Sequence, residues 1–266
     1  MTKRIDLFDS TYSHFTEQVL DAIRKETFGE DIGQNSWLTV DEYDRFIPEL
    51  RLGPEDHLLE VASGSGGPAL YLANKFGCNV TGVDANESGI ATATQSAVKL
   101  KRTDRVNFRL VDASAPLPFA DNTFDGLLCI DSMNHFPSRL SVFREWQRVL
   151  RPGRRALFTD PVVITGPVTN RELFDRSNIG LFVFIPPETT ERFITDAGLR
   201  LVNLEDVTAN IALTSGRWLN ARAERRDALL QIESETDFDS LQTFLTAVHT
   251  LTSDRRLSRF AFLAEK

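Results

Sequence analysis

Short apolar runs alternate with helical patterns between residues 58 and 160, and the connections between them are only a few residues long. Five of the runs have the length and composition of buried strands. They are residues 58–62, 78–84, 106–112, 124–131 and 156–160. Apolar residues recur at helical spacing in three segments, namely 68–76, 87–101 and 138–150. This alternation predicts a parallel, doubly wound sheet with helices on both faces.

The pattern changes after residue 160, where proline and glycine become frequent. A helix, a strand, two further helical patterns and a closing strand are predicted there. They lie at 187–199, 200–209, within 215–250 and at 255–266.

The first 50 residues are mostly helical in pattern, with aromatic residues at intervals. We therefore expect residues 1–50 to form a helical N-terminal cap and residues 51–266 to form the main domain. Lid or binding-site insertions are expected at about 161–187 and 210–253.

Composition and charge narrow the class of protein. The chain of 266 residues has 41% hydrophobic and 26% charged residues, as soluble globular domains do. Its net charge of −8 argues against a nucleic-acid partner, because phosphate attraction dominates such binding. No signal-peptide core and no apolar run of membrane-spanning length is present, so we expect a cytoplasmic protein without a membrane partner. The four histidines and two cysteines have no metal-ligand spacing, and we expect no metal.

The stretch EVASGSGGPAL (60–70) leads a predicted strand through a glycine cluster directly into a helix. Glycines there permit a tight turn and a close approach of ligand to backbone, and the helix N-terminus offers free N–H groups. Asp84 ends the second strand, where a carboxylate can accept both hydroxyls of a ribose. A plain turn followed by an exposed aspartate is the alternative interpretation.

Four motifs in order resemble those of class I S-adenosylmethionine-dependent methyltransferases. EVASGSG resembles the acid-x-Gly-x-Gly-x-Gly motif, with Ala62 at the first glycine, and VTGVDAN resembles the second motif. VDASAPLPFADNTFDGLLCIDSMNHFP resembles the third, and VLRPGRRALF the turn into the fifth strand, with Arg154 at the second glycine. The resemblance covers residues 55–160 well and 187–266 loosely, and the small-molecule branch is most similar, including quinone C-methyltransferases and sarcosine or phosphoethanolamine N-methyltransferases.

This resemblance implies a Rossmann-like, doubly wound, mostly parallel seven-stranded sheet with an antiparallel C-terminal strand. It implies S-adenosylmethionine as cofactor and S-adenosylhomocysteine as product. The implied cofactor-binding residues are Glu60, Ser63, Gly64, Gly66, Asp84, Ala85, Asp112, Ala113, Ile130 and Asp131. Asp84 is expected on the ribose and Asp112 on the adenine amine. Asp121 and Asp125 lie in a turn composition, and we expect structural or solvated roles for them.

The methyl acceptor is expected to be a small molecule bound by segments outside the sheet. The N-terminal FGEDIGQNSW (28–37) resembles a loop that the family places over its active site, although the family's common histidine is missing. The residues expected at the acceptor are Tyr12, Gln34, Trp37, Phe182 and Trp218. His135 is the candidate catalytic base, since imidazole suits proton abstraction near neutral pH; a packed histidine at a helix entry is the alternative.

The sequence leaves the acceptor atom open among amine nitrogen, hydroxyl oxygen and activated carbon. Two other functions compete. An NAD-dependent oxidoreductase would need a Tyr-x-x-x-Lys pair, and the only match, Tyr71 with Lys75, lies on the helix after the glycine turn. A non-catalytic S-adenosylmethionine-binding protein is the second. We expect a monomer or a homodimer.

Overall fold

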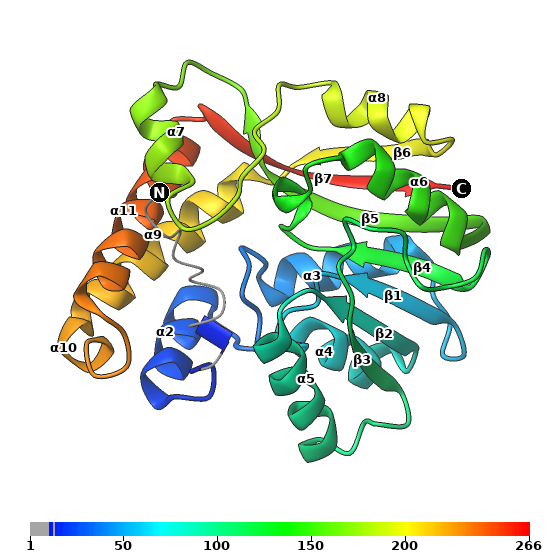
Figure 1. Ribbon diagram of the computed structural model, residues 1–266, viewed down its shortest axis with the longest axis horizontal. Coiled ribbons are helices and arrows are strands. Elements are labelled where there is room, and N and C mark those ends of the chain that lie inside the picture. The colour runs from blue at the N-terminus through cyan, green and yellow to red at the C-terminus, as the bar shows by residue number, and fades with distance from the viewer. Residues whose placement is uncertain (1–10, 13) are drawn as a thin grey trace.

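Seven strands form one sheet in the order β3-β2-β1-β4-β5-β7-β6 (Figure 1). The structure is a computed structural model, and it describes residues 11, 12 and 14–266. The strands are β1 (His57–Val61), β2 (Asn79–Asp84), β3 (Val106–Leu110), β4 (Phe124–Cys129), β5 (Leu150–Ile164), β6 (Arg200–Asp206) and β7 (Leu257–Glu265). β7 runs antiparallel to both of its neighbours, and the other six strands are parallel. The expected Rossmann-like sheet is confirmed.

Helices cover both faces of this sheet. They are α4 (Gly67–Phe76), α5 (Glu87–Lys99), α6 (Arg139–Val149), α8 (Thr189–Asp196) and, before β1, α3 (Val40–Phe46) and the 3-10 turn η1 (Ile47–Leu50). Two other helices, α2 (Gln18–Phe28) and α7 (Asn170–Arg176), lie away from the sheet, with the helical group described next. α6 and α8 bury Trp146 and Ile194 against one face of the sheet, while α3 and α4 bury Tyr43 and Leu70 against the other. Two apolar cores therefore hold the sheet between them.

A group of helices lies to one side of the sheet (Figure 1). It contains α9 (Thr208–Glu224), α10 (Arg226–Leu229) and α11 (Glu235–Ser253), and α2 and α7 pack against it. Its own apolar clusters include Ile211, Leu245 and Val248 around Trp37, and Ile23 with Phe238. None of the helices within the described ranges has the length and apolar character needed to span a membrane.

Several strand boundaries differ from those that the pattern predicts, among them the ends of β5 and β3. β5 extends well beyond the predicted 156–160, because β7 pairs with it from Arg155 to Ile164. β3 ends at Leu110 rather than at residue 112, where the chain turns into the wall of the cavity described next. Long-range pairing, which a local pattern does not encode, sets these ends.

Candidate active site

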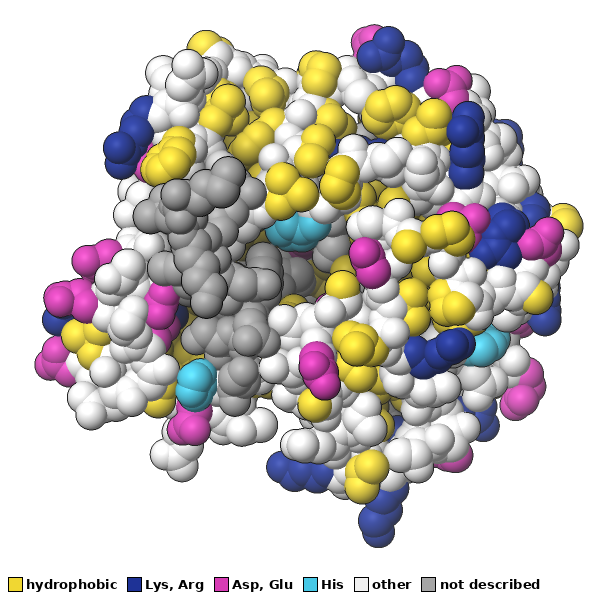
Figure 2. All heavy atoms as spheres, in the orientation of Figure 1, with side chains coloured by type: hydrophobic (Ala, Val, Ile, Leu, Met, Phe, Trp, Pro, Cys, Tyr) yellow, Lys and Arg dark blue, Asp and Glu magenta, His cyan; other side chains and the backbone are white. Residues whose placement is uncertain are grey.

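A cavity of about 640 Å³ opens where the parallel strands β1, β2 and β4 end. Ligands of open α/β sheets bind at this edge, and the volume is within the range of small-molecule sites. The glycine turn after β1 and the ends of β2, β3 and β4 line one part of it. Residues 33 and 35–37, residues of the segment 176–182, α9 and α11 line the other part. Figure 2 shows a hollow on this face with hydrophobic side chains gathered beside it.

The glycine turn holds the acid of β2 in the cavity wall. Gly64 has a φ of 52°, a left-handed conformation that glycine adopts without strain. Its N–H donates to Asp84 Oδ2 over 2.8 Å, and the Asn86 N–H donates to Asp84 Oδ1 over 2.8 Å. Burial raises the pKa of Asp84 above its ordinary value, and these backbone bonds oppose the rise. The carboxylate is fixed, with lone pairs left for a ligand.

Two buried polar atoms in this wall have no hydrogen-bond partner among the described residues. They are Oε2 of Glu60 and Oγ of Ser63, and both residues line the cavity. Burial, together with the nearby charge of Asp84, raises the pKa of Glu60 to about 8. Because unpaired buried polar atoms are costly, these atoms fit a bound group that carries N–H or O–H donors, as an amino acid moiety with a ribose does.

N-terminal segments close over the glycine turn. The Tyr12 hydroxyl lies so near Gly64 that a Cβ there would be 2.6 Å from it. Ser65 Oγ donates to the Gly33 carbonyl over 3.0 Å. Tyr12 therefore lines the cavity at its glycine end.

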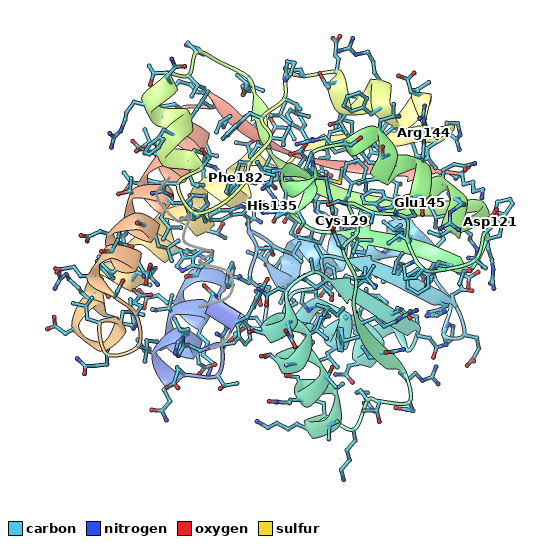
Figure 3. All side chains as sticks on the ribbon, in the orientation of Figure 1. Asp121, Cys129, His135, Arg144, Glu145 and Phe182 are labelled. Atoms are coloured by element: carbon cyan, nitrogen blue, oxygen red, sulfur yellow. The ribbon has the colours of Figure 1, made fainter. Side chains whose placement is uncertain are left out.

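The other end of the cavity is aromatic. The ring of Trp37 packs on Trp218 and Phe244, with centroid distances of 5.6 and 6.2 Å. Phe182 packs on Phe244 at 5.8 Å and on the His135 ring at 4.9 Å. Figure 3 shows His135 and Phe182 close together between the sheet and the helical group. This wall suits an apolar or aromatic molecule.

Hydrogen bonds fix the ring of His135. Nδ1 lies 2.8 Å from the carbonyl oxygen of Leu181, which can only accept, so Nδ1 carries the proton in the neutral ring. Nε2 then accepts from Nδ2 of Asn134 over 3.0 Å. The amide oxygen of Asn134 is buried, lines the cavity and has no partner in the described chain.

Asp131 holds the end of β4 to the N-terminal and C-terminal segments. Arg259 donates to it from Nε over 2.6 Å and from Nη2 over 3.2 Å, the Thr159 hydroxyl over 2.7 Å and the Trp37 N–H over 2.9 Å. Arg259 Nη1 also contacts both oxygens of Glu42, at 2.8 and 2.7 Å. All three charged side chains are buried. Asp131 lines the cavity, but its carboxylate already accepts four hydrogen bonds.

Two predicted site residues, Gly66 and Gln34, are not among the residues that line the cavity. Gly66 faces the sheet instead, because a Cβ at this position would come within 2.5 Å of Phe108. Gln34 is buried within its own loop, where its side chain accepts from the Ile32 N–H over 2.8 Å and donates to the Glu30 carbonyl over 3.1 Å. The other predicted cofactor residues all line the cavity, as do Trp37, Phe182, Trp218 and His135.

Two further acids of the third motif have the structural roles that were expected. Asp125 is buried and accepts from the His57 N–H and from Arg151 over 3.0 and 2.6 Å. Asp121 is exposed, pairs with Arg148 and lies at the far end of the sheet from His135 (Figure 3). Neither belongs to the cavity wall.

Several residues of the aromatic end were not anticipated from the sequence. Among them are Asn134, Arg176 and Phe244. Arg176 and Phe244 lie outside the four motifs, in helices that carry no motif. The one available signal for Arg176 is its spacing, three residues after Leu173 and three before Ile179, which places it on the apolar side of a short helix.

Comparison with known proteins agrees with this fold. A family model described as a methyltransferase domain matches residues 59–158. The chain is 30% identical to 27-O-demethylrifamycin SV methyltransferase of Amycolatopsis mediterranei, over 77% of this chain and 78% of that protein. It is 31% identical to sarcosine/dimethylglycine N-methyltransferase of Halorhodospira halochloris, over 68% of this chain and 64% of that protein.

Solved structures share the fold. The phosphoethanolamine N-methyltransferase 2 of Haemonchus contortus, solved with phosphomonomethylethanolamine and S-adenosylhomocysteine, superposes with a TM-score of 0.80 at 20% identity. The match covers 97% of this chain and 60% of that one.

The fold and the glycine-turn site are those of a class I methyltransferase. This chain belongs to the S-adenosylmethionine-dependent methyltransferases that act on small molecules. It is an enzyme that uses S-adenosylmethionine and leaves S-adenosylhomocysteine as product, and its relatives give no support to an oxidoreductase or an idle binding protein.

Proposed function

We propose that the glycine end of the cavity binds S-adenosylmethionine and that the aromatic end binds a hydroxyl-bearing acceptor, which is methylated on oxygen. The observation behind this proposal is the division of one cavity into two chemically different ends. Unpaired Glu60 and Ser63 atoms lie at the glycine end, and aromatic rings lie at the other. When bound, the cofactor supplies a methyl group that its sulfonium has already activated.

Within this proposal each of the cofactor-binding residues contacts a different part of S-adenosylmethionine. Glu60 would pair with its ammonium group, and Asp84 would accept the ribose hydroxyls. Asp112 and the Ala113 backbone would contact the adenine, with Ala85 beside it. Ile130 would line the methionine end. The carboxylate of Asp131 would act indirectly, by fixing Trp37, because its four hydrogen bonds are already made.

An oxygen acceptor is favoured over a cationic amine by the charge of the aromatic end. Arg176 lies in this wall, with its guanidinium carbon 4.7 Å from the ring centroids of both Phe182 and Phe244. A resident cation repels an ammonium and already occupies ring faces that would otherwise attract one. The relative from Amycolatopsis acts, by its name, on an O-demethylated compound, which agrees with this choice.

His135 is proposed as the base that removes the hydroxyl proton. The Leu181 carbonyl fixes the proton on Nδ1, so Nε2 is the atom that can accept another. The acceptor hydroxyl would replace the Asn134 amide at Nε2, and Asn134 would turn toward the acceptor. If this is correct, His135→Ala lowers turnover by about 10²- to 10⁴-fold and leaves S-adenosylhomocysteine binding unchanged. Near-full turnover in that variant would exclude the base role.

The experiment for the proposed function combines calorimetry and a labelled-methyl screen. S-adenosylhomocysteine is titrated into the wild type and into Asp84→Ala, with Asp121→Ala as a control outside the cavity. Binding that Asp84→Ala weakens and Asp121→Ala leaves unchanged supports the cofactor assignment. Phenols, other alcohols and amines are then offered with labelled S-adenosylmethionine, and transfer only to amines would overturn the choice of oxygen.

Residues 11–50, as far as they are described, are proposed as the cap over this site, with lids at about 161–187 and 210–253. The contacts of Gly33 and Trp37 with the glycine turn and β4 support this division. Residues 1–10 of the predicted cap lie outside the described residues. A cytoplasmic location, a monomer or homodimer, and the lack of a nucleic-acid partner stay predictions, to be tested by fractionation, sedimentation and binding assays.

A further inference from the structure

Within the described part of the chain, five arginines are at least nine-tenths buried, and one of them differs from the rest. These arginines are Arg139, Arg155, Arg176, Arg222 and Arg259. Four form ion pairs, with Asp160, Glu265, Glu233, and the pair Glu42 and Asp131, respectively. Arg176 is fully buried, forms no ion pair with any acidic side chain in the described ranges, and none of its three guanidinium nitrogens has a hydrogen-bond partner there.

The surroundings of Arg176 leave its charge without an internal partner. Asp131 and Asp160 are near enough to favour its charged form, but Arg259 and Arg139 already pair with them. Burial lowers the pKa of Arg176 to about 9, so the side chain is still a cation at neutral pH. Contact with two aromatic rings recovers only part of the cost of burying an unpaired charge.

Arg176 faces the aromatic end of the cavity, where it is the only lysine or arginine among the described lining residues. A planar guanidinium with free N–H groups matches two oxygens of a carboxylate through parallel hydrogen bonds. One fixed positive charge balances one negative charge, whereas a phosphate monoester carries nearly two. The neighbouring Ile179, Trp218 and Phe244 offer only apolar surface and ring faces to the remainder of a ligand.

We propose that Arg176 binds a carboxylate of the methyl acceptor, and that the acceptor is an apolar or aromatic carboxylic acid that also bears the hydroxyl to be methylated. The inference rests on the proposed function, because it assigns this end of the cavity to the acceptor. The role of Arg176 is to anchor and select the acceptor; the proton of the hydroxyl is left to His135.

The test compares acids with their neutral amides. Benzoate, phenylacetate and 4-hydroxybenzoate, each beside its amide, are titrated into the enzyme saturated with S-adenosylhomocysteine. The wild type is expected to bind at least one acid more tightly than its amide. Arg176→Met should weaken the binding of that acid about 30-fold or more and leave the binding of its amide unchanged. Arg176→Lys should restore part of the preference, since it keeps the charge without the fork.

Arg171→Met is the matched control. Arg171 lies on the same helix as Arg176, and its side chain is 77% exposed and pairs with Asp175. Arg171→Met should bind acids as the wild type does. The proposal is wrong if no acid binds better than its amide, if Arg176→Met keeps the preference, or if phenyl phosphate binds more tightly than every carboxylate.

The same titrations separate this inference from the proposed function. S-adenosylhomocysteine binding is measured first, in all variants, and Arg176→Met should retain it. If the cofactor product does not bind the wild type, the proposed function fails. If it binds and the acids show no preference that depends on Arg176, only the carboxylate inference fails.

Discussion

Replacement of Arg259 by methionine tests how the buried charges hold the site. Arg259 is fully buried and supplies the hydrogen bonds that two buried carboxylates, Glu42 and Asp131, receive from a cation. Removing one partner of a buried ion pair costs about 3 to 5 kcal/mol, because the remaining charge is uncompensated. For a chain of this size we expect the melting temperature to fall by roughly 6 to 20 °C.

The stability lost in Arg259→Met should be smaller at low pH than at high pH. Burial already raises the pKa of Glu42, and Arg259 opposes that rise. Without Arg259 the folded pKa of Glu42 rises further above its unfolded value, so the folded variant holds a proton that the unfolded chain releases. Its stability is then greatest below the ordinary glutamate pKa and declines as the pH rises through the raised one. We expect the difference in free energy of unfolding between wild type and Arg259→Met to be at least about 1 kcal/mol smaller at pH 5 than at pH 8.

The assay is urea unfolding followed by tryptophan fluorescence at both pH values. Glu42→Gln is added to Arg259→Met as a control, because it removes one of the uncompensated charges. The double variant should be more stable than Arg259→Met alone at pH 8. A loss that is independent of pH, together with a double variant whose two effects simply add, would refute the electrostatic reasoning.

Three further predictions follow from other residues of the site. Ala62 has a φ of 58°, so Ala62→Gly should raise the free energy of unfolding by up to about 1 kcal/mol, measured by urea titration; a decrease would contradict the strain. Glu60 has a pKa of about 8 and is mostly protonated at pH 7, so pairing with the ammonium group of S-adenosylhomocysteine should release close to one proton on binding. Calorimetry in two buffers with different ionisation enthalpies measures this release. Binding to Glu60→Gln should release no proton. Arg176→Met should have a melting temperature no lower than that of the wild type, because it removes a buried cation without an ion-pair partner. Arg139→Met should instead lower the free energy of unfolding by about 3 kcal/mol, because it leaves Asp160 without its partner. A large loss of stability in Arg176→Met would indicate a structural role for Arg176.

The sequence predicted the sheet because most of its strands are buried on both faces. Residues 58–62 and 124–131 are mostly apolar, and the structure buries β1 and β4 almost completely. The glycine turn and Asp84 were predictable for a related reason, since they are adjacent to strand ends whose position in a parallel sheet is fixed. Local pattern and global fold agree there.

The acceptor end was less predictable, because its residues come from segments that meet only in three dimensions. Trp37, Phe182 and Trp218 were anticipated as aromatic residues outside the sheet. Arg176 was not, because an arginine in a polar stretch is ordinarily exposed, and its burial depends on α11 packing against α7. Gln34 differs from these residues, because its amide forms hydrogen bonds within its own loop and it does not line the cavity.

The position of Arg259 on β7 has a consequence for folding during synthesis. Glu42 and Arg259 are 217 positions apart in sequence, yet they share a buried ion pair. The cap therefore leaves the ribosome with an acid whose cation is made 217 residues later. Until β7 inserts between β5 and β6, Glu42 and Asp131 lack the cation that pairs with both of them, and the segment that carries Trp37 lacks part of its support. Contacts of such long range also favour slow closure of the final strand.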